Sequence, residues 1–195
     1  MTKIITISRE FGAGGGEIGK RLAEKLGWEF YDKALILEAA KEAGISGAES
    51  VIEDEIAPTN FGFGQSLFDF YNRPLNEKLF AAQKEVIRKI AEHGKCVIVG
   101  RNANAILKEF DNAIHVFITA DSFWRAERLQ SEKMTNMPMQ KVQAQVIAVD
   151  KKRKKYCSYY TDTEFGEAKY YDICLDSSKI GIDKCVDVIY SLVKQ

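Results

Sequence analysis

The chain has 195 residues, of which 46% are hydrophobic, and its 28 Lys and Arg residues are balanced by 28 Asp and Glu residues. This length suits one domain over residues 1–195; without a net positive field we expect no nucleic-acid partner, and no apolar run approaches the roughly 18 residues of a membrane span. No secretory signal precedes Cys96, Cys157, Cys174 and Cys185, which form no C-x-x-C pair, so we expect reduced thiols and a cytoplasmic protein.

The most informative stretch begins near the N-terminus. Residues 4–8 form a β-branched run that predicts a buried strand, and apolar residues from 18 to 26 repeat at helical spacing. Between them, residues 12–16 read Gly-Ala-Gly-Gly-Gly. A glycine-rich turn between a strand and the start of a helix is typical of an anion site, because the helix N-terminus points amides and a partial positive charge at the ligand. A plain flexible turn is the alternative.

Three motif registers compete for these glycines. Gly14, Gly19 and Lys20 fit the phosphate-loop pattern G-x-x-x-x-G-K, but that register starts the helix near Lys20, after the helical repeat has already begun. Gly14, Gly16 and Gly19 fit G-x-G-x-x-G, but too many residues separate the strand from the first glycine. The third register has the loop over residues 9–15 and the helix from Gly16, and it matches the length of a phosphate loop.

The next strand is the aromatic run over residues 28–31, which ends at Asp32. Asp32 precedes a helical pattern over residues 35–43, so it is either a helix N-cap, a ligand contact at the sheet edge, or both. Periodicity then weakens, and we expect a mobile insert at about residues 45–74. Its aromatic residues 61–71 fit a cover for the core edge, a lid or a dimer surface, which leaves a homo-oligomer open.

A helical pattern over residues 75–90 leads to a buried strand over residues 96–99, followed by Gly100, Arg101 and Asn102. A charge directly after a buried parallel strand lies at the edge where ligands bind. We therefore interpret Arg101 as an anion contact in preference to a plain surface arginine.

A further buried strand is predicted over residues 114–118, followed by a helix that carries Arg125 and Arg128 on one face. His115, inside the strand, is interpreted as a core histidine, and with His93 the only other histidine a zinc site is not expected. An exposed basic face is the ordinary reading of the two arginines.

The C-terminal third begins with a loop over residues 134–139 and a helix over 142–149 that runs into five consecutive cations, 151–155. A last strand over residues 171–176 and a helix over 182–193 close the chain. Strands that alternate with helices predict an α/β fold, a three-layer parallel sheet with helices on both faces and right-handed crossovers.

Taken together, these segments resemble the cytidylate kinase-like branch of the nucleoside monophosphate kinases, within the phosphate-loop (P-loop) NTPases. The segments that carry the resemblance are residues 4–26, 30–33, 97–102, 125–128, 150–153 and 171–176. The resemblance implies a kinase that uses ATP and Mg²⁺ and binds small-molecule nucleotides, with a basic lid at about residues 134–170.

By position, the resemblance assigns three groups of residues. Gly12, Ala13, Gly14, Gly15, Gly16 and Glu17 would hold the donor phosphates. Asp32, Lys33, Arg101 and Asn102 would contact the acceptor nucleotide. Arg125, Arg128 and Arg153 would surround the transferred phosphoryl group. Cations and amides suit this chemistry, because phosphoryl transfer depends mainly on positioning and on stabilising charge at the equatorial oxygens.

The chain departs from the family pattern at three places. Gly15 stands where the loop lysine is expected, Gly16 and Glu17 stand near the place of a metal-binding hydroxyl, and Arg101-Asn102 replaces an Arg-Asp pair. An active kinase then needs another cation at the β and γ phosphates. Arg9 is favoured over Lys20, because Arg9 flanks the loop and its guanidinium meets phosphate oxygens as a fork.

The first functional hypothesis is an ATP-dependent nucleoside monophosphate kinase-like phosphotransferase with CMP or dCMP as acceptor. The second is a nucleotide- or phosphate-binding regulatory module with little or no turnover, in which case Gly15→Lys is the substitution expected to restore catalysis. The third is a kinase for a non-nucleotide small molecule.

Overall fold

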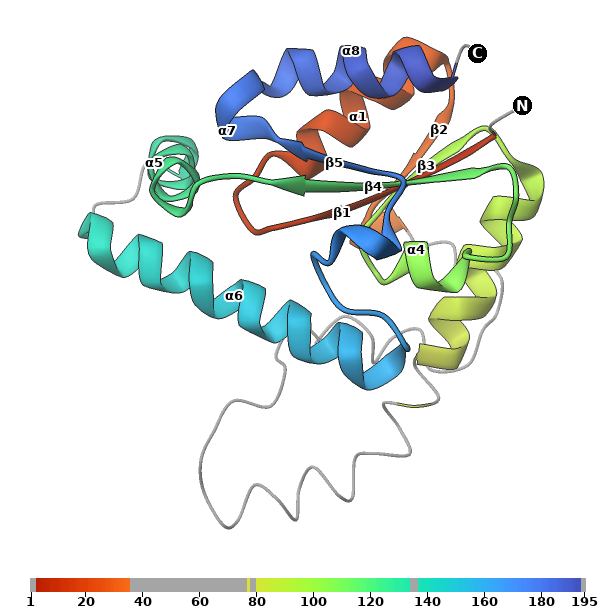
Figure 1. Cartoon of the computed structure of the whole chain (residues 1–195), viewed down its shortest axis with the longest axis horizontal. Helices are drawn as coiled ribbons and strands as arrows, with labels where there is room; N and C mark the ends of the chain where they lie inside the picture. The colour runs from red at the N-terminus through yellow and green to blue at the C-terminus, as the bar shows by residue number, and fades with distance from the viewer. Residues whose placement is uncertain (1–2, 36–76, 78–79, 134–136, 194–195) are drawn as a thin grey trace.

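The computed structural model describes residues 3–35, 77, 80–133 and 137–193. Its centre is a parallel five-stranded sheet with the strand order β2-β3-β1-β4-β5 (Figure 1). The strands are β1 Ile4–Arg9, β2 Glu29–Tyr31, β3 Cys96–Val99, β4 Ala113–Thr119 and β5 Ile173–Asp176. The prediction that β1, β3 and β4 are parallel neighbours is confirmed, since β1 pairs with both of the others.

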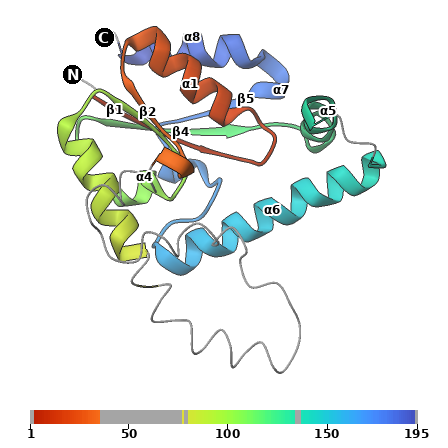
Figure 2. The same cartoon turned by 180° about the vertical axis from the view of Figure 1, so that it is seen from behind.

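Helices cover both faces of the sheet, as the sequence predicts. Helices α1 (Gly15–Leu26) and α8 (Ile182–Val193) lie together on one face, and a helix over residues 80–93 lies with α4 (Ala103–Ile106) on the other (Figures 1 and 2). The remaining elements are α5 Ser122–Lys133, α6 Met139–Tyr160, the 3₁₀ turn Ala168–Tyr170 and α7 Ser177–Ile180. The architecture is therefore a three-layer α/β sheet.

The two-residue period of the strands divides their side chains between the two faces. In β3, Val97 and Val99 pack into the core beneath α1 and α8, whereas Cys96 and Ile98 pack towards the helix over residues 80–93. All four side chains are buried. A central parallel strand is apolar throughout for this reason, and each fully buried Val or Ile contributes about 1.5–3 kcal/mol.

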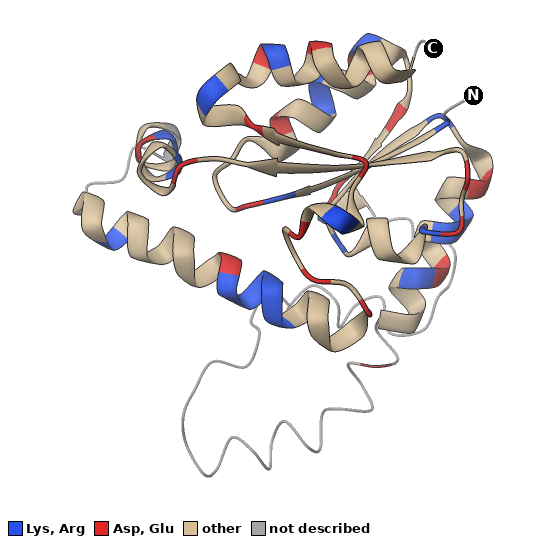
Figure 3. Cartoon of the chain, in the orientation of Figure 1, with Lys and Arg blue, Asp and Glu red and all other residues tan. Residues whose placement is uncertain are grey.

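Helices α5 and α6 lie beyond the carboxyl ends of β1 and β4. They pack against each other through a small cluster that includes Leu129 and Val146, and Phe11, from the segment after β1, packs against this cluster. The cations at 151–155 belong to the C-terminal half of α6 (Figure 3). The fold thus brings a basic helix to the edge of the sheet where β1 ends.

The element boundaries differ from the predicted ones in small ways. Strand β1 extends through Arg9, and α1 starts at Gly15, one residue early. Strand β5 starts at Ile173 instead of residue 171, because the chain first makes a 3₁₀ turn in which the Tyr171 amide donates to the Ala168 carbonyl. Gly27 ends α1 in the left-handed conformation, as expected of a C-cap.

The proposed insert at 45–74, with its aromatic residues 61–71, and nearly all of the helix predicted over 35–43 lie outside the described residues. Within the described part of the chain, no helix is both long enough and apolar enough to cross a membrane. All four cysteines are free thiols.

Candidate active site

The segment between β1 and α1 has the form of a phosphate loop. Gly12 and Gly14 have φ angles of 82° and 80°, which side chains rarely adopt, and Gly14 is the N-cap of α1. Gly19 belongs to the second turn of α1, where a Cβ would lie 2.6 Å from Val99 Cγ2. Gly19 therefore serves close helix–strand packing, and the loop follows the third of the predicted registers.

Four side chains from other elements hold the carbonyl oxygens of this loop. Arg153 donates to the Arg9 carbonyl at 3.0 Å, and Arg125 donates to the Phe11 carbonyl at 3.1 Å. On the other side of the loop, Arg128 donates to the Gly12 carbonyl at 3.4 Å and Ser177 to the Ala13 carbonyl at 2.8 Å. The loop shape is therefore fixed by α5, α6 and α7 as well as by its own glycines.

Unlike these carbonyl oxygens, the amides at the start of α1, those of residues 14–17, have no hydrogen-bond partner among the described residues, as expected for the first turn of a helix. These amides and the helix dipole make the segment suited to an anion. Glu17, at the end of this segment, forms ion pairs with Arg128 at 2.5 Å and with Arg21, so its charge is offset.

A buried ion cluster joins α5 and α6 to the loop at Phe11. The Arg125 residue is 5% exposed, and its guanidinium pairs with Asp150 at short distance and with Glu10 at 3.8 Å. Asp150 also accepts the Phe11 amide at 2.7 Å. Burial raises the pKa of the Asp150 carboxyl, against the opposing effects of the Phe11 amide and of Arg125. The cluster fastens α5 and α6 to the loop.

This placement differs from what the sequence predicts for Arg125. The resemblance puts Arg125 beside the transferred phosphoryl group, whereas its guanidinium is bound to Asp150, Glu10 and the Phe11 carbonyl. The reason is burial, because a buried guanidinium requires a carboxylate partner, and here Asp150 is that partner. In this structure Arg125 is therefore tied to the loop, and its contact with the transferred phosphoryl group stays a prediction.

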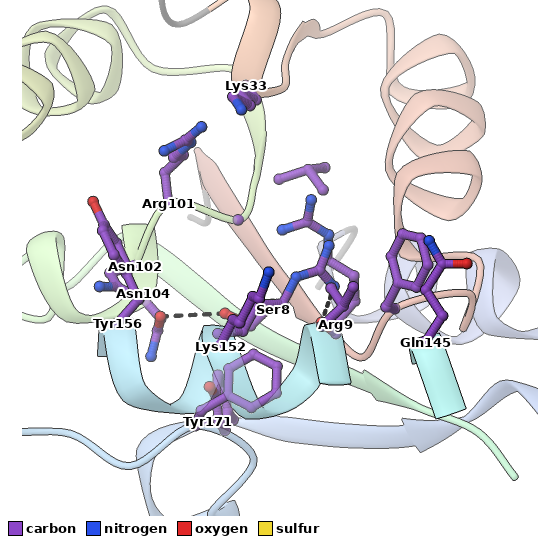
Figure 4. A pocket seen from close by; sticks show the side chains of 16 residues that line it. Ser8, Arg9, Lys33, Arg101, Asn102, Asn104, Gln145, Lys152, Tyr156 and Tyr171 are labelled. Carbon is purple, nitrogen blue, oxygen red and sulfur yellow. Dashed lines mark hydrogen bonds between the residues drawn. The ribbon is translucent and has the colours of Figure 1, made fainter. Parts of the chain in front are cut away.

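A cavity of about 350 Å³ opens beside the loop, at the carboxyl ends of β1 and β3 (Figure 4). Among the described residues that line it there is no Asp or Glu. Five cations from the described part of the chain line it, namely Arg9, Lys33, Arg101, Lys152 and Arg153. The aromatic rings of Phe11, Tyr156, Phe165 and Tyr171 complete much of its wall. Although the whole chain has no net charge, this cavity is positively charged.

Polar side chains form one wall of the cavity. The Ser8 hydroxyl donates to Asn104 Oδ1 at 3.2 Å, and Tyr171 lines the cavity beside them (Figure 4). Burial raises the pKa of Tyr171, so its hydroxyl is neutral at physiological pH. Sequence reasoning did not single out these three residues or Gln145, and it included Lys152 only as one cation of the run 151–155. The available signal was the polar Ser8 at the end of an apolar strand.

The turn after β3 is conformationally strained. Gly100, Arg101 and Asn102 have consecutive φ angles of 82°, 58° and 53°, and the buried Gln83 side chain donates to the Arg101 carbonyl at 3.0 Å. Arg101 Nη2 and Asn102 Nδ2 are buried without a hydrogen-bond partner in the described part of the chain. Strained backbone and unpaired donors beside a cavity indicate a ligand-binding turn.

The remaining predicted residues fall into two groups. Asp32 accepts hydrogen bonds from the Ala34 and Leu35 amides at 2.9 and 3.2 Å, so the expected helix N-cap is confirmed, while a ligand contact by the same residue stays a prediction. Asp32, Arg125 and Arg128 do not line the cavity, whereas Arg9, Lys33, Arg101, Asn102 and Arg153 do. Within the described residues, no group of three or more His, Cys, Asp or Glu residues could hold a metal ion.

Comparison with known proteins places the chain among kinase-like proteins. The model of the family described as "Cytidylate kinase-like family" matches residues 4–179. No curated protein sequence matches the chain. An uncharacterized protein from Eubacterium ventriosum ATCC 27560 has a similar solved structure, with 27% identity, a TM-score of 0.75, and coverage of 100% of this chain and 99% of that chain.

Two shikimate kinases have related folds. The enzyme from Bacteroides thetaiotaomicron is 14% identical with a TM-score of 0.59, and it covers 99% of both chains. The enzyme from Acinetobacter baumannii, solved in complex with shikimate, is 15% identical with a TM-score of 0.52, covering 99% of this chain and 93% of that chain. At these identities the likeness shows a P-loop kinase fold alone.

Proposed function

The chain belongs to the cytidylate kinase-like family, and from this premise we propose that it is an ATP-dependent phosphotransferase whose acceptor already carries a phosphate group. CMP and dCMP are the leading acceptors. The observation that supports this proposal is the cavity with five lining cations and, among the described residues, no lining carboxylate. A cytoplasmic location, consistent with four free thiols, is part of the proposal.

The charge of the cavity favours a phosphate acceptor over an alcohol. A hydroxyl nucleophile needs a base to remove its proton, and in kinases a carboxylate commonly takes that role. A phosphate monoester already carries about −1.5 to −2 charges at pH 7 and needs no base. A cationic lining whose described residues include no carboxylate therefore suits an acceptor phosphate, and it argues against the alternative of a kinase for a hydroxyl-bearing small molecule.

The donor is proposed to bind with its phosphates on the amides at the start of α1. Mg²⁺, when bound, neutralises charge on these phosphates and is held mainly by them, because this metal keeps several waters and uses few protein carboxylates. Glu17 is the acidic residue in the first turn of α1. Arg9 and Arg153 lie between the loop and the cavity and would stabilise the transferred group, while Arg101 and Lys33 would hold the acceptor.

The test is a screen of ribonucleoside and deoxyribonucleoside monophosphates with ATP and Mg²⁺, with shikimate included as an alcohol acceptor. We expect turnover with a pyrimidine monophosphate. A ligand at 100 times its dissociation constant should add about 2.7 kcal/mol to the free energy of unfolding, which raises the melting temperature by roughly 5–11 °C. Turnover with shikimate alone would contradict the proposed acceptor class.

A matched pair of variants tests the role of the cavity. Lys152 lines the cavity, while Lys154, two residues further along α6, is exposed and does not line it. Lys152→Ala should lower kcat/KM for the acceptor by about 10–100-fold, the equivalent of one charge-assisted hydrogen bond, and Lys154→Ala should leave it unchanged. Equal effects of the two substitutions would contradict the assignment.

A second candidate is a nucleotide-binding module with little turnover, because residue 15 is glycine in place of the loop lysine. In that case the wild-type protein would bind ATP in calorimetry but transfer no phosphoryl group to any monophosphate. Homo-oligomer formation stays a prediction that size-exclusion chromatography with light scattering can test.

A further inference from the structure

Relative to the phosphate-loop pattern, the glycine and the cation have exchanged places at positions 9 and 15. If Gly14 is taken as the second glycine of G-x-x-x-x-G-K, the first glycine of the pattern falls on residue 9 and the lysine falls on residue 15. The chain has Arg at position 9 and Gly at position 15. The observed start of α1 at Gly15 supports this register.

The two residues are in direct contact. A Cβ added to Gly15 would lie 2.6 Å from Arg9 Cβ and 2.7 Å from Arg9 Cγ, closer than such atoms normally approach. The aliphatic stem of Arg9 therefore occupies the space into which a side chain at residue 15 would project. Gly15 is required because Arg9 is present, and the backbone conformation at Gly15 gives no separate reason, since its φ is not positive.

The far end of Arg9 meets a second glycine. A Cβ on Gly100 would lie 1.9 Å from Arg9 Nη1 and 2.9 Å from Arg9 Cζ. The side chain thus runs from the start of α1 to the turn after β3, and it crosses from the loop to the cavity that holds Arg101 (Figure 4). The Arg153 bond to the Arg9 carbonyl holds the main chain at the start of this path.

We propose that Arg9 and Gly15 are an exchanged pair, in which an arginine from the end of β1 supplies the phosphate-binding cation that a lysine on α1 would otherwise supply. This inference rests on the proposed function. Only one long side chain fits between the two positions. The loop therefore accommodates either arginine at position 9 with glycine at position 15, or glycine at position 9 with lysine at position 15. The guanidinium reaches Gly100, in the turn that also carries Arg101.

The exchange reverses the expectation that Gly15→Lys restores catalysis. In the presence of Arg9, the new lysine would collide with the Arg9 stem and displace it, so the single variant would lose the native cation without room for the new one. If Arg9 is first replaced by glycine, the lysine has space to reach the phosphates. The two substitutions should therefore compensate each other.

The experiment compares the wild type with Arg9→Gly, Gly15→Lys and the double variant, with Lys20→Ala as a control for a nearby exposed cation on α1. The measurements are kcat/KM, ATP affinity by calorimetry and the thermal unfolding midpoint. We expect each single substitution to reduce kcat/KM by about 100-fold or more and the double variant to regain at least about 10-fold over either. Gly15→Lys should unfold at a lower temperature than the double variant, and Lys20→Ala should match the wild type.

Two outcomes would overturn the exchange. One is a Gly15→Lys protein that is as stable and as active as the wild type, and the other is a double variant no better than Arg9→Gly in ATP affinity and unfolding midpoint. A wild-type protein that binds ATP without turnover would instead refute the kinase proposal, and the exchange would then be decided by ATP affinity. If the wild type fails to bind ATP, the exchange is decided by the unfolding midpoints of the wild type, the two single variants and the double variant.

Discussion

Removal of the Asp150 carboxylate should destabilise the protein more than removal of any exposed carboxylate. Asp150 pairs with Arg125, which is 5% exposed, and accepts the Phe11 amide at 2.7 Å. In Asp150→Ala the guanidinium stays buried, and Glu10, 3.8 Å away, is the one charged partner that the described residues still provide. A broken buried ion pair costs about 3–5 kcal/mol, and because the Asp150 side chain is 16% exposed we expect the lower end, about 3 kcal/mol.

The assay is urea unfolding, supported by a thermal scan. For a chain of this size, 3 kcal/mol corresponds to a fall of roughly 6–12 °C in the melting temperature. The matched control is Asp183→Ala, which breaks the Arg21–Asp183 ion pair, in which the Asp183 side chain is 89% exposed. Exposed pairs contribute about 0–1 kcal/mol.

A third variant separates the charge effect from lost packing. Asp150→Ala combined with Arg125→Met removes both charges, so it should lose less stability than the sum of the two single substitutions. If Asp150→Ala loses no more free energy of unfolding than Asp183→Ala, the cluster does not fasten the loop and the reasoning is refuted.

Two further predictions concern the loop and the sheet. Gly14→Val should abolish ATP binding in calorimetry, because the new Cβ would lie 2.2 Å from Ile182 Cδ1 at a φ of 80°, whereas Gly16→Ala, which meets no atom within 4 Å, should retain it; equal affinities would mean that the loop is only a turn. Burial lowers the pKa of His115 from its usual 6.5, so the free energy of unfolding should fall as pH decreases below about 6.5 towards that lowered pKa. His115→Gln should reduce this loss of unfolding free energy at low pH, measured by urea titrations at pH 7.5, 6.5 and 5.5. An unchanged pH dependence would show that His115 is not its source.

The strands and the loop register could be predicted because their signals are local. A β-branched run such as residues 4–8 predicts a buried strand from neighbouring residues alone, and the helical repeat locates the start of α1 within one residue. The parallel order of β1, β3 and β4 followed from the alternation of strands and helices.

The buried contacts of Arg125 could not be predicted in the same way. Its helix shows two arginines on one face, and nothing in that pattern distinguishes a buried ion pair from an exposed one. The partner, Asp150, lies 25 residues away on another helix, and Phe11 lies 114 residues away. Such partners are chosen by tertiary packing, which leaves no periodic mark in the sequence.

The polar wall of the cavity was missed for a related reason. Ser8 and Asn104 are separated by 96 residues, and each alone is an ordinary polar residue at the end of an element. Arg101 was identified because a charge stands directly after a buried strand. The strain of the turn that carries it, with three consecutive positive φ angles, became visible only in the backbone.

Helix α6 holds the loop at two points, through the Asp150 bond to the Phe11 amide and the Arg153 bond to the Arg9 carbonyl. Any outward movement of α6 has to break both bonds, so the position of the helix and the conformation of the loop are thermodynamically linked. A nucleotide that binds the loop more tightly when α6 is docked must, by reciprocity, hold α6 in place by the same factor. The amide proton of Phe11 should therefore exchange with solvent only when α6 lifts, and its exchange rate, with and without ATP, measures how strongly the donor closes the helix over the acceptor.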